Sequence, residues 1–303
     1  MPVRELSSSP PMPLLFARAG VAMVPFASRL PFVGGGGQDI PDLTLVLNDV
    51  AVEPGRVEAY GRVCGLEGSG LSAGTLPPTY PHMLAFPLQL SLMTDGSFPF
   101  PAMGLVHIYN RIVQHRPLSV SERLTLRVWS GPVEPHPRGR QFSIHTEARV
   151  GDELVWEEIS TNLKRGGGDS AAEAPDVPSA ADLPVGEEWK LGGDLGRRYG
   201  SVSGDLNPIH VHPLTARLFG FPSAIAHGMW TKARCLAALS SRLPDAFNVE
   251  AAFRRPIVLP ATVALTASPG EGTASGDVGF GVRDADKDTP HLDGRLTPIS
   301  AGS

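Results

Sequence analysis

The sequence predicts an α+β fold in which an antiparallel sheet curls around one helix, and in which this arrangement is built twice. Three observations support the prediction. Strand-like runs follow apolar helical segments in both halves, two short motifs recur at one fixed offset, and a stretch with almost nothing to bury separates the halves. The 303 residues suffice for two domains of about 150 residues each.

The separating stretch lies at residues 166–187, where Gly, Ala, Pro and acidic residues dominate. Such a composition is typical of an exposed linker, because it offers little apolar surface to bury. We therefore expect one domain over residues 1–165 and a second over residues 188–303.

Two motifs indicate that the halves are copies of each other. Residues 59–65 (AYGRVCG) align with residues 198–204 (RYGSVSG) at an offset of 139, and residues 116–118 (RPL) align with residues 255–257 (RPI) at the same offset. Two anchors that share an offset are harder to explain by chance than either alone, so we infer an internal duplication.

Each copy is expected to begin with a short strand and a short helix. These helices are predicted at residues 56–63 and 194–202, with Asp194 as the N-cap of the second. A more apolar helix is predicted at residues 228–243, where small and apolar residues recur at helical spacing. Strands are predicted at residues 105–113, 124–129, 142–150 and 153–163 in the first half, and at 248–253, 262–267 and 277–282 in the second.

Composition excludes several classes of partner. Hydrophobic residues make up 42% and charged residues 19%, an ordinary globular balance. The net charge of −5 is not gathered into a block, so we expect neither a nucleic-acid ligand nor an anionic membrane surface. The longest run without charged residues, 68–94, contains four prolines that we expect to break any helix in it, and we therefore predict no membrane span.

The two cysteines, Cys64 and Cys235, cannot build a disulfide framework. The apolar N-terminal run is broken by Arg18, Pro25 and Arg29, which predicts a short helix or docking strap rather than an export signal. Free thiols without an export signal fit a cytoplasmic protein. We expect both cysteines to be small core residues rather than nucleophiles.

The chemistry-bearing segment is residues 203–210 (SGDLNPIH), followed by residues 226–229 (AHGM). Pro208 is expected to exclude a helix and Gly204 to permit a tight turn, so Asp205 and His210 should lie on a constrained non-helical loop. Their side chains can then converge. A carboxylate and an imidazole that hold one water between them form an acid–base pair suited to neutral pH.

Gly228 stands where the apolar helix should begin. Its backbone N–H has no partner inside the helix and lies at the positive end of the helix dipole. A glycine also lets a ligand approach that N–H closely. A thioester carbonyl placed there would be polarised as negative charge builds on its oxygen, an effect typically worth about 2.7–4 kcal/mol in oxyanion sites.

These two segments resemble the (R)-specific enoyl-thioester hydratases of the MaoC-like hot-dog family. The loop motif and the His-Gly-Met both occur, in order and at the family's usual separation. The whole chain resembles the double hot-dog members, the bacterial (3R)-hydroxyacyl-thioester dehydratases, which also carry a Thr-Tyr-Pro-like stretch (here residues 79–82) and a Phe-Pro-rich segment (here residues 86–101). The resemblance implies a double hot-dog fold, packed as a pseudo-dimer within one chain.

The resemblance also implies roles for individual positions. Asp205 and His210 match the catalytic pair, and Gly228 matches the residue whose N–H binds the thioester oxygen. Ser203 and Asn207 match positions that shape the loop, and we group Tyr199 with them as a site-shaping residue. In the first half Leu66 stands where Asp205 would be, so we expect that half to be catalytically silent. In such relatives the central region of the first half, here residues 76–93, makes room for the acyl tail.

The remaining histidines receive more modest predictions. We expect His212 to be a loop histidine and His227 to orient the helix start, while His82 and His107 should be structural or line a tunnel. No metal is expected, because His210, His212 and His227 lack convincing ligand spacing. No other cofactor is expected, since the glycines at 34–37 lack the context of a phosphate-binding loop.

The predicted function is the reversible hydration of trans-2-enoyl thioesters and dehydration of (3R)-hydroxyacyl thioesters in fatty-acid metabolism. The carrier stays open between CoA and acyl-carrier protein, as do the chain length, the direction, a possible homodimer, and which of Asp205 and His210 is the base. Two alternatives are a thioesterase of the same fold and a non-catalytic acyl-thioester binder. The absence of Asp and Glu from residues 228–243 disfavours the thioesterase, and the intact Asp205 and His210 disfavour the binder.

Overall fold

A computed structural model describes residues 2–22, 39–67, 74–269 and 276–299 of the protein. The chain forms two compact units, and each of them is discontinuous in sequence. The first unit comprises residues 1–51, 81–110 and 123–175, and the second comprises residues 52–80, 111–122 and 176–303. The predicted domains, 1–165 and 188–303, follow instead from the linker composition of residues 166–187, and that division stays a prediction.

The first unit is built on a sheet with the strand order β1-β2-β4-β6-β7, and β5 pairs with β6. The β1–β2 pair is parallel, whereas the β2–β4, β4–β6 and β6–β7 pairs are antiparallel. Strand β3 begins in this unit and ends in the second. The bounds of these elements are β1 Val3–Leu6, α1 Met12–Val21, β2 Thr44–Val50, α3 Tyr80–Met93, β3 Val106–Gln114, β4 Leu124–Ser130, β5 Glu134–His136, β6 Gly139–Val150 and β7 Glu153–Arg165.

Helix α3 corrects one prediction, because it runs without a break through the proline-rich segment. Pro87 lies inside the helix and has no N–H to donate to the preceding turn. Tertiary packing offsets that loss, since Ala85, Leu88 and Leu92 are almost completely buried and Gln89 donates to Thr146 on β6. Within the described ranges, none of the helices combines the length and the apolar character that a membrane crossing needs.

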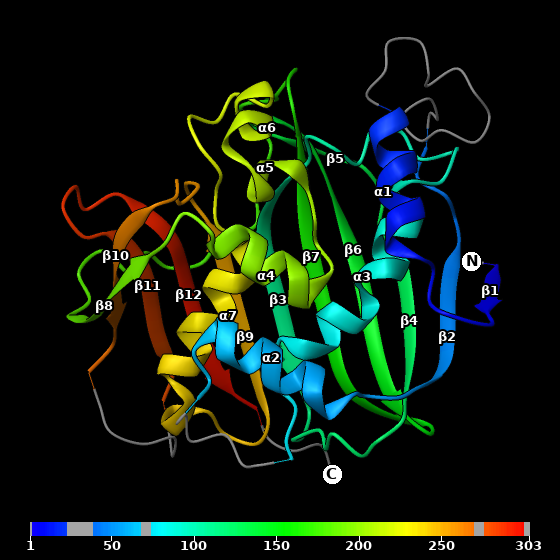
Figure 1. The fold of residues 1–303 in the computed structure, drawn as a ribbon, viewed down its shortest axis with the longest axis horizontal. Coiled ribbons are helices and arrows are strands. Elements are labelled where there is room, and N and C mark those ends of the chain that lie inside the picture. Colours follow the sequence, from blue (N-terminus) through cyan, green and yellow to red (C-terminus); the bar gives the residue numbers. More distant parts are fainter. Residues whose placement is uncertain (1, 23–38, 68–73, 270–275, 300–303) are drawn as a thin grey trace. The chain divides into compact units, whose positions relative to one another are not determined.

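The second unit contains an antiparallel sheet with the order β9-β12-β11-β10-β8. Helix α7 packs on this sheet, where the buried Lys232 donates from Nζ to the Val249 carbonyl of β9 (Figure 1). The bounds are α2 Pro54–Cys64, β8 Val185–Leu191, α4 Leu195–Ser203, α5 Pro208–Val211, α6 Pro213–Leu218, α7 Gly228–Ala238, a 3-10 turn η2 Ser240–Arg242, β9 Phe247–Phe253, β10 Ala261–Ala267, β11 Val278–Asp284 and β12 Pro290–Pro298.

Strand β8 is the short strand expected before the helix at residues 194–202, whereas β12 was not among the predicted strands. Its sequence, PHLDGRLTP, contains Asp293, Gly294 and Arg295 in the middle, which obscures the alternation expected of a half-buried strand. The ring of Phe280 on β11 fills the space above Gly294, where a Cβ atom would come within 2.3 Å of the ring. Gly294 is therefore a packing residue, not a strand breaker.

The predicted linker is less exposed than its composition indicates. Val177 and Ala180 are buried, with 6% and 2% of their surface exposed, and β8 already begins at Val185. The amide of Ala180 donates to Asp293 on β12. Gly281 leaves room for Ala180, whose Cβ would lie only 2.7 Å from a Cβ at position 281. Small residues in this stretch thus permit close packing against the sheet of the second unit.

The motifs that suggested a duplication occupy equivalent structural positions. Helices α2 and α4 both end at a glycine in the left-handed region, Gly65 with φ 72° and Gly204 with φ 79°. The second pair of motifs also forms matching backbone hydrogen bonds. In the first half Leu76 N donates to Leu118 O and Val120 N donates to Gly74 O; in the second half Ala226 N donates to Ile257 O and Leu259 N donates to Ala224 O. The acceptors Leu118 and Ile257 are 139 residues apart, and so are the donors Val120 and Leu259.

Both cysteines are buried core residues, as the sequence predicts. Burial raises the pKa of the Cys64 thiol to about 12, with a small opposing effect of Tyr60 and Arg234. Cys64 is therefore a neutral thiol at physiological pH, which makes it a poor nucleophile.

Candidate active site

Helix α4 forms the base on which the chemistry-bearing loop folds back. A Cβ atom at Gly196 would lie 1.9 Å from the carbonyl oxygen of His210, and one at Gly200 would lie 2.8 Å from the carbonyl oxygen of Asp205. Only glycine permits such close approach of two backbones. Asp194 is the N-cap residue of α4, as predicted, but its side chain makes no capping hydrogen bond.

Asp205 follows the left-handed Gly204 and is fixed by its neighbours. Its amide donates to Ser203 Oγ at 3.2 Å, and its carboxylate Oδ1 accepts from the Asn207 amide at 3.1 Å. Ser203 thus holds the backbone of Asp205, and Asn207 holds its carboxylate. The Asp205 side chain remains 26% exposed, so one part of the carboxylate is accessible.

His210 lies on a helical turn, which corrects the prediction that Pro208 excludes a helix. Pro208 is the first residue of α5, where the missing N–H is not needed for a helical bond. Asn207 caps this turn by accepting from the Ile209 amide at 3.4 Å. His212 has a parallel role, because its Nδ1 caps α6 by accepting from the Leu214 amide.

The tautomer of His210 follows from its hydrogen bond. Nδ1 lies 2.8 Å from the Ile225 carbonyl oxygen, which can only accept, so Nδ1 carries the proton. Nε2 then presents a lone pair. Burial lowers the pKa of His210, while the Asp205 carboxylate and the Ile225 carbonyl partly oppose that effect. His210 is thus a neutral imidazole able to accept a proton at neutral pH.

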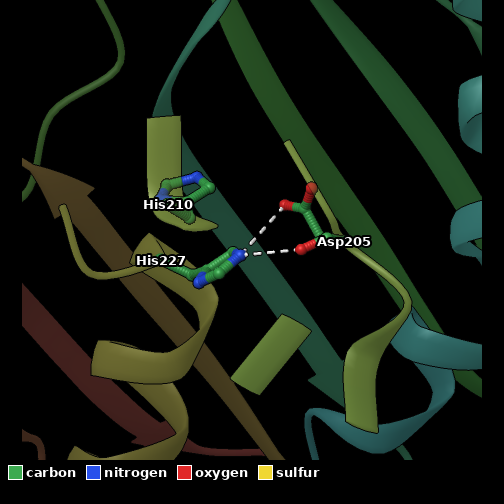
Figure 2. Close-up of side chains that lie close together, drawn as sticks. All are labelled: Asp205, His210 and His227. Carbon is green, nitrogen blue, oxygen red and sulfur yellow. Dashed lines mark hydrogen bonds and ion pairs between the residues drawn. The ribbon is translucent and has the colours of Figure 1, made fainter. Parts of the chain in front are cut away.

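His227 joins the cluster in a way that the sequence did not predict. Its side chain does not cap α7. Instead, Nε2 donates to the Asp205 carbonyl at 3.0 Å and lies 3.7 Å from the Asp205 carboxylate Oδ2 (Figure 2). Its ring stacks on that of His210, with centroids 3.7 Å apart and an interplanar angle of 25°. Burial, reinforced by the adjacent His210, holds the pKa of His227 well below its ordinary value.

Gly228 begins α7 immediately after His227. No side chain caps this helix start, so the amides of its first turn have no intrahelical acceptors and face the N-terminal end. The ring of Phe253 on β9 packs against Gly228, and a Cβ atom there would lie 3.0 Å from that ring. A larger residue at this position would therefore require the Phe253 ring to shift.

Tyr199 lies beneath the two histidines. It is 1% exposed, and its ring centroid is 4.8 Å from that of His227 and 6.0 Å from that of Tyr60 on α2. The other two histidines singled out in the sequence, His82 and His107, lie in the first unit. His82, in the first unit, donates from Nδ1 to Glu158 at 2.8 Å and takes no part in the Asp205 cluster.

Asp205, His210 and His227 bring three potential ligand atoms within 4.8 Å of one another. The spacing in sequence gave no indication of this proximity. A cation bound by all three would have to displace the Nε2 proton that His227 donates to the Asp205 carbonyl. Its two imidazole ligands would also be stacked on each other, whereas metal ligands are normally spread around the ion. The arrangement fits proton transfer better than metal ligation.

Several residues of the site were missed in the sequence. Gly196, Gly200 and the Ile225 carbonyl act through close approaches that appear only after folding. The i, i+4 spacing of the two glycines, which puts them on one face of α4, was the available signal.

Comparison with known proteins places this geometry in a family. A family model described as a MaoC like domain matches residues 187–280, which include the whole cluster. A curated protein of Mycobacterium tuberculosis, 3-hydroxyacyl-thioester dehydratase X, is 35% identical over 268 residues, which cover 88% of this chain and 92% of that protein.

Solved structures agree with that relationship. The crystal structure of HtdX of Mycobacterium tuberculosis is 34% identical and matches with a TM-score of 0.73, covering 84% of this chain and 100% of the other. A second protein of that organism, described as having a double hotdog fold, is 14% identical and matches with a TM-score of 0.55 over 87% of this chain and 98% of its own. The chain belongs to the MaoC-like dehydratase family and has the double hot-dog fold.

Proposed function

We propose that this protein catalyses the reversible hydration of trans-2-enoyl thioesters and the dehydration of (3R)-hydroxyacyl thioesters, with Asp205 and His210 as its acid–base pair. The single observation that carries the proposal is the arrangement of these two side chains: a partly exposed carboxylate beside a neutral imidazole whose Nε2 is a free acceptor. The family and the name of the 35% identical relative support the reaction class.

In the hydration direction, the pair holds a water molecule over C3 of the substrate. One proton of the water passes to the pair as the water oxygen bonds to C3. The electrons of the C2–C3 double bond move toward the thioester carbonyl, and a proton from the pair is delivered to C2. Positioned proton transfer of this kind contributes about 10²–10⁴-fold to a rate.

The negative charge that develops on the thioester oxygen needs a donor. The uncapped start of α7 offers the Gly228 amide, at the positive end of the helix dipole. Gly228 directly follows His227, whose ring stacks on that of His210. This order fits a substrate that lies across the helix start with C3 toward Asp205 and His210.

The charge around the motif fits an anionic carrier. Between residues 195 and 243, Asp205 is the only acidic residue, whereas six residues are Lys or Arg. Of these six, Lys232 is buried and Arg234 pairs with Glu187, which leaves four for the surface charge. Arg197 and Arg217 lie on the surface and donate hydrogen bonds to the backbone carbonyls of Val211 and Pro222. CoA and acyl-carrier protein are both negatively charged, so this surface suits either substrate carrier.

The first half lacks the catalytic residues, and we propose that it is silent in the reaction. Leu66 follows the glycine that ends α2, at the place where Asp205 follows Gly204 after α4. A leucine can neither accept nor donate a proton, so the single acid–base site of the second half carries the turnover.

One assay separates the proposal from its alternatives. Purified protein is mixed with crotonyl-CoA while the absorbance of the conjugated thioester and the release of free thiol are followed. We expect the absorbance to fall without thiol release, and the product to be the (3R)-hydroxyacyl thioester. Thiol release would indicate a thioesterase, and no change in either signal, on CoA and carrier-protein substrates alike, would indicate a binding protein.

Variants then assign the reaction to the pair. Asp205→Asn and His210→Ala should each lower kcat/KM by about 10²–10⁴-fold. His212→Ala is the matched control, because it removes a nearby imidazole that lies outside the cluster. If Asp205→Asn or His210→Ala turns over at the rate of the parent, the proposed assignment is wrong.

A further inference from the structure

We infer that His227 is a positioning residue of this site: as a neutral ring it fixes the Asp205 loop by a hydrogen bond and supports His210 by stacking. The inference rests on the proposed function and extends it. His227 touches neither the proposed water nor the thioester in this scheme, and it acts through the two residues that do.

The hydrogen bond of His227 holds the loop from a distant part of the chain. Nε2 donates to the Asp205 carbonyl at 3.0 Å across 22 residues of sequence. Ser203 and Asn207 hold Asp205 only locally. The bond from His227 ties Asp205 to the start of α7. It therefore sets the distance between the carboxylate and the Gly228 amide, the two ends of the proposed reaction.

Stacking fixes the second member of the pair. The centroid of the His227 ring lies 3.7 Å from that of His210 and 4.8 Å from that of Tyr199. Together with the bond from His210 Nδ1 to Ile225, the stack leaves the His210 ring little freedom to rotate. The two histidines thus hold complementary tautomers, His227 protonated on Nε2 and His210 on Nδ1.

A buried polar atom supports a functional rather than a purely structural role. His227 is 3% exposed, and its Nδ1 has no hydrogen-bond partner among the residues described. An unsatisfied buried acceptor destabilises a fold, so a residue kept only for packing would be better served by an apolar ring. The imidazole at this position is explained by the donor on its opposite side.

Neutrality of the ring is part of the inference. The titratable groups that face His227 are Asp205 on its loop, His210 on α5 and Tyr199 on α4. A proton on His227 would place a positive charge against His210 just as His210 accepts its own proton, and would weaken it as a base. Burial and the adjacent His210 disfavour that charge.

Two variants test the inference by separating the donor from the ring. His227→Phe keeps a flat ring for stacking but removes the donor, whereas His227→Gln keeps an amide N–H near the position of Nε2. In crotonyl-CoA hydration we expect His227→Phe to lower kcat by about 10²-fold, the size typical of a misplaced catalytic group, with little change in KM. His227→Gln should recover kcat to within about tenfold of the parent and keep the acid limb of its pH profile.

Three results would overturn the inference. They are a parental kcat in His227→Phe, a kcat in His227→Gln as low as that of a folded His227→Phe, and loss of the acid limb in His227→Gln, which would make His227 itself the proton acceptor. Thermal unfolding of each variant is measured in parallel. If His227→Phe does not fold, the recovery and pH profile of His227→Gln decide alone. An inactive parent protein would instead refute the proposed function, so the two failures are distinguishable.

Discussion

At the scale of single residues, the proposed chemistry depends on an imidazole that stays neutral. His210 is half-buried beside a second, fully buried histidine, and burial lowers the pKa of both. An unperturbed histidine titrates at about 6.5, so these two remain unprotonated at pH values where an exposed histidine would already be charged. The neutral form is the one that can accept a proton from water.

The lowered pKa values predict how activity depends on pH. Because the active form of His210 is neutral, kcat/KM should begin to fall only below about pH 6.5, the ordinary value for an imidazole. A pH series of initial rates from about 5 to 8 measures this limb. An acid limb centred at or above about 6.5 would contradict the neutral imidazole of His210 as the active form.

The same pKa values predict the pH dependence of stability. In the unfolded chain His210 and His227 bind protons near about pH 6.5, whereas in the folded protein they do so only at lower pH. Their contribution is therefore present above that pH and is lost as the pH falls. We expect the thermal midpoint to drop on acidification below about pH 6.5, and to drop less in His227→Gln.

Residue identity was the part of the site most accessible from sequence. Asp205, His210 and Gly228 stand in a motif with fixed spacing, and the structure brings the carboxylate and both imidazoles together. The role of His227 was not accessible, because its partner is a backbone carbonyl 22 residues earlier. Such a contact leaves no trace in the side-chain pattern of either segment.

At the scale of secondary-structure elements, the site depends on how closely α4 and α5 approach. Gly196 faces the His210 carbonyl at a distance that excludes any Cβ atom. The glycine thus fixes where α5, and with it the His210 ring, can lie. A substitution here should disturb the site without touching a catalytic side chain.

Gly196→Ala tests this dependence. We expect it to lower the free energy of unfolding by about 1–3 kcal/mol or more through overpacking, and to lower kcat because α5 must move. Gly193→Ala is the matched control, since a Cβ at that position meets nothing within 4 Å. Urea unfolding and crotonyl-CoA kinetics measure both effects. Equal stability and equal kcat in the two variants would show that the close approach has no consequence.

The boundaries of the strands and helices show where the prediction from sequence differs from the structure. The predicted strands in both halves form, with ends shifted by a few residues, because their alternation reflects one buried face. The effect of proline was predicted wrongly in two helices. Pro208 starts α5 instead of preventing a helix, and Pro87 is carried inside α3 by the surrounding core. Whether a helix forms around a proline depends on the proline's position in that helix and on the tertiary packing, and the local sequence reveals neither.

At the scale of the whole molecule, the two copies of one plan have kept different polar interiors. The second half holds the acid–base cluster. In the first unit, α3 and β7 share a different buried network, in which Glu158 accepts from His82, Gln89 and Asn110. Burial acts to raise the pKa of Glu158, but His82 and the hydrogen bonds outweigh it and hold that pKa below its ordinary value.

This network predicts a structural role for the first unit. Glu158→Gln should lower the free energy of unfolding by about 3–5 kcal/mol, because it leaves the buried donors without their charged partner. At temperatures well below its unfolding midpoint the variant should keep a kcat close to that of the parent. Exposed Glu134 provides the control, and Glu134→Gln should change stability by no more than about 0.5 kcal/mol.

The outcome for Glu158→Gln distinguishes a structural role of the first unit from participation in the reaction. A folded variant with normal stability but lost turnover would mean that the first unit takes part in the reaction. The duplication itself was readable from two short motifs at one offset. The buried network was not, because His82, Gln89, Asn110 and Glu158 are scattered over residues 82–158 without a common motif.

The most direct test of the central claim is a double-mutant cycle of Asp205→Asn and His210→Ala, measured as kcat/KM for crotonyl-CoA hydration. If both side chains act on one water, removing the second after the first should cost little more, and the double variant should be about as slow as the slower single variant. Losses that multiply would mean that the two groups act independently, and a single variant with the parental rate would remove that group from the mechanism.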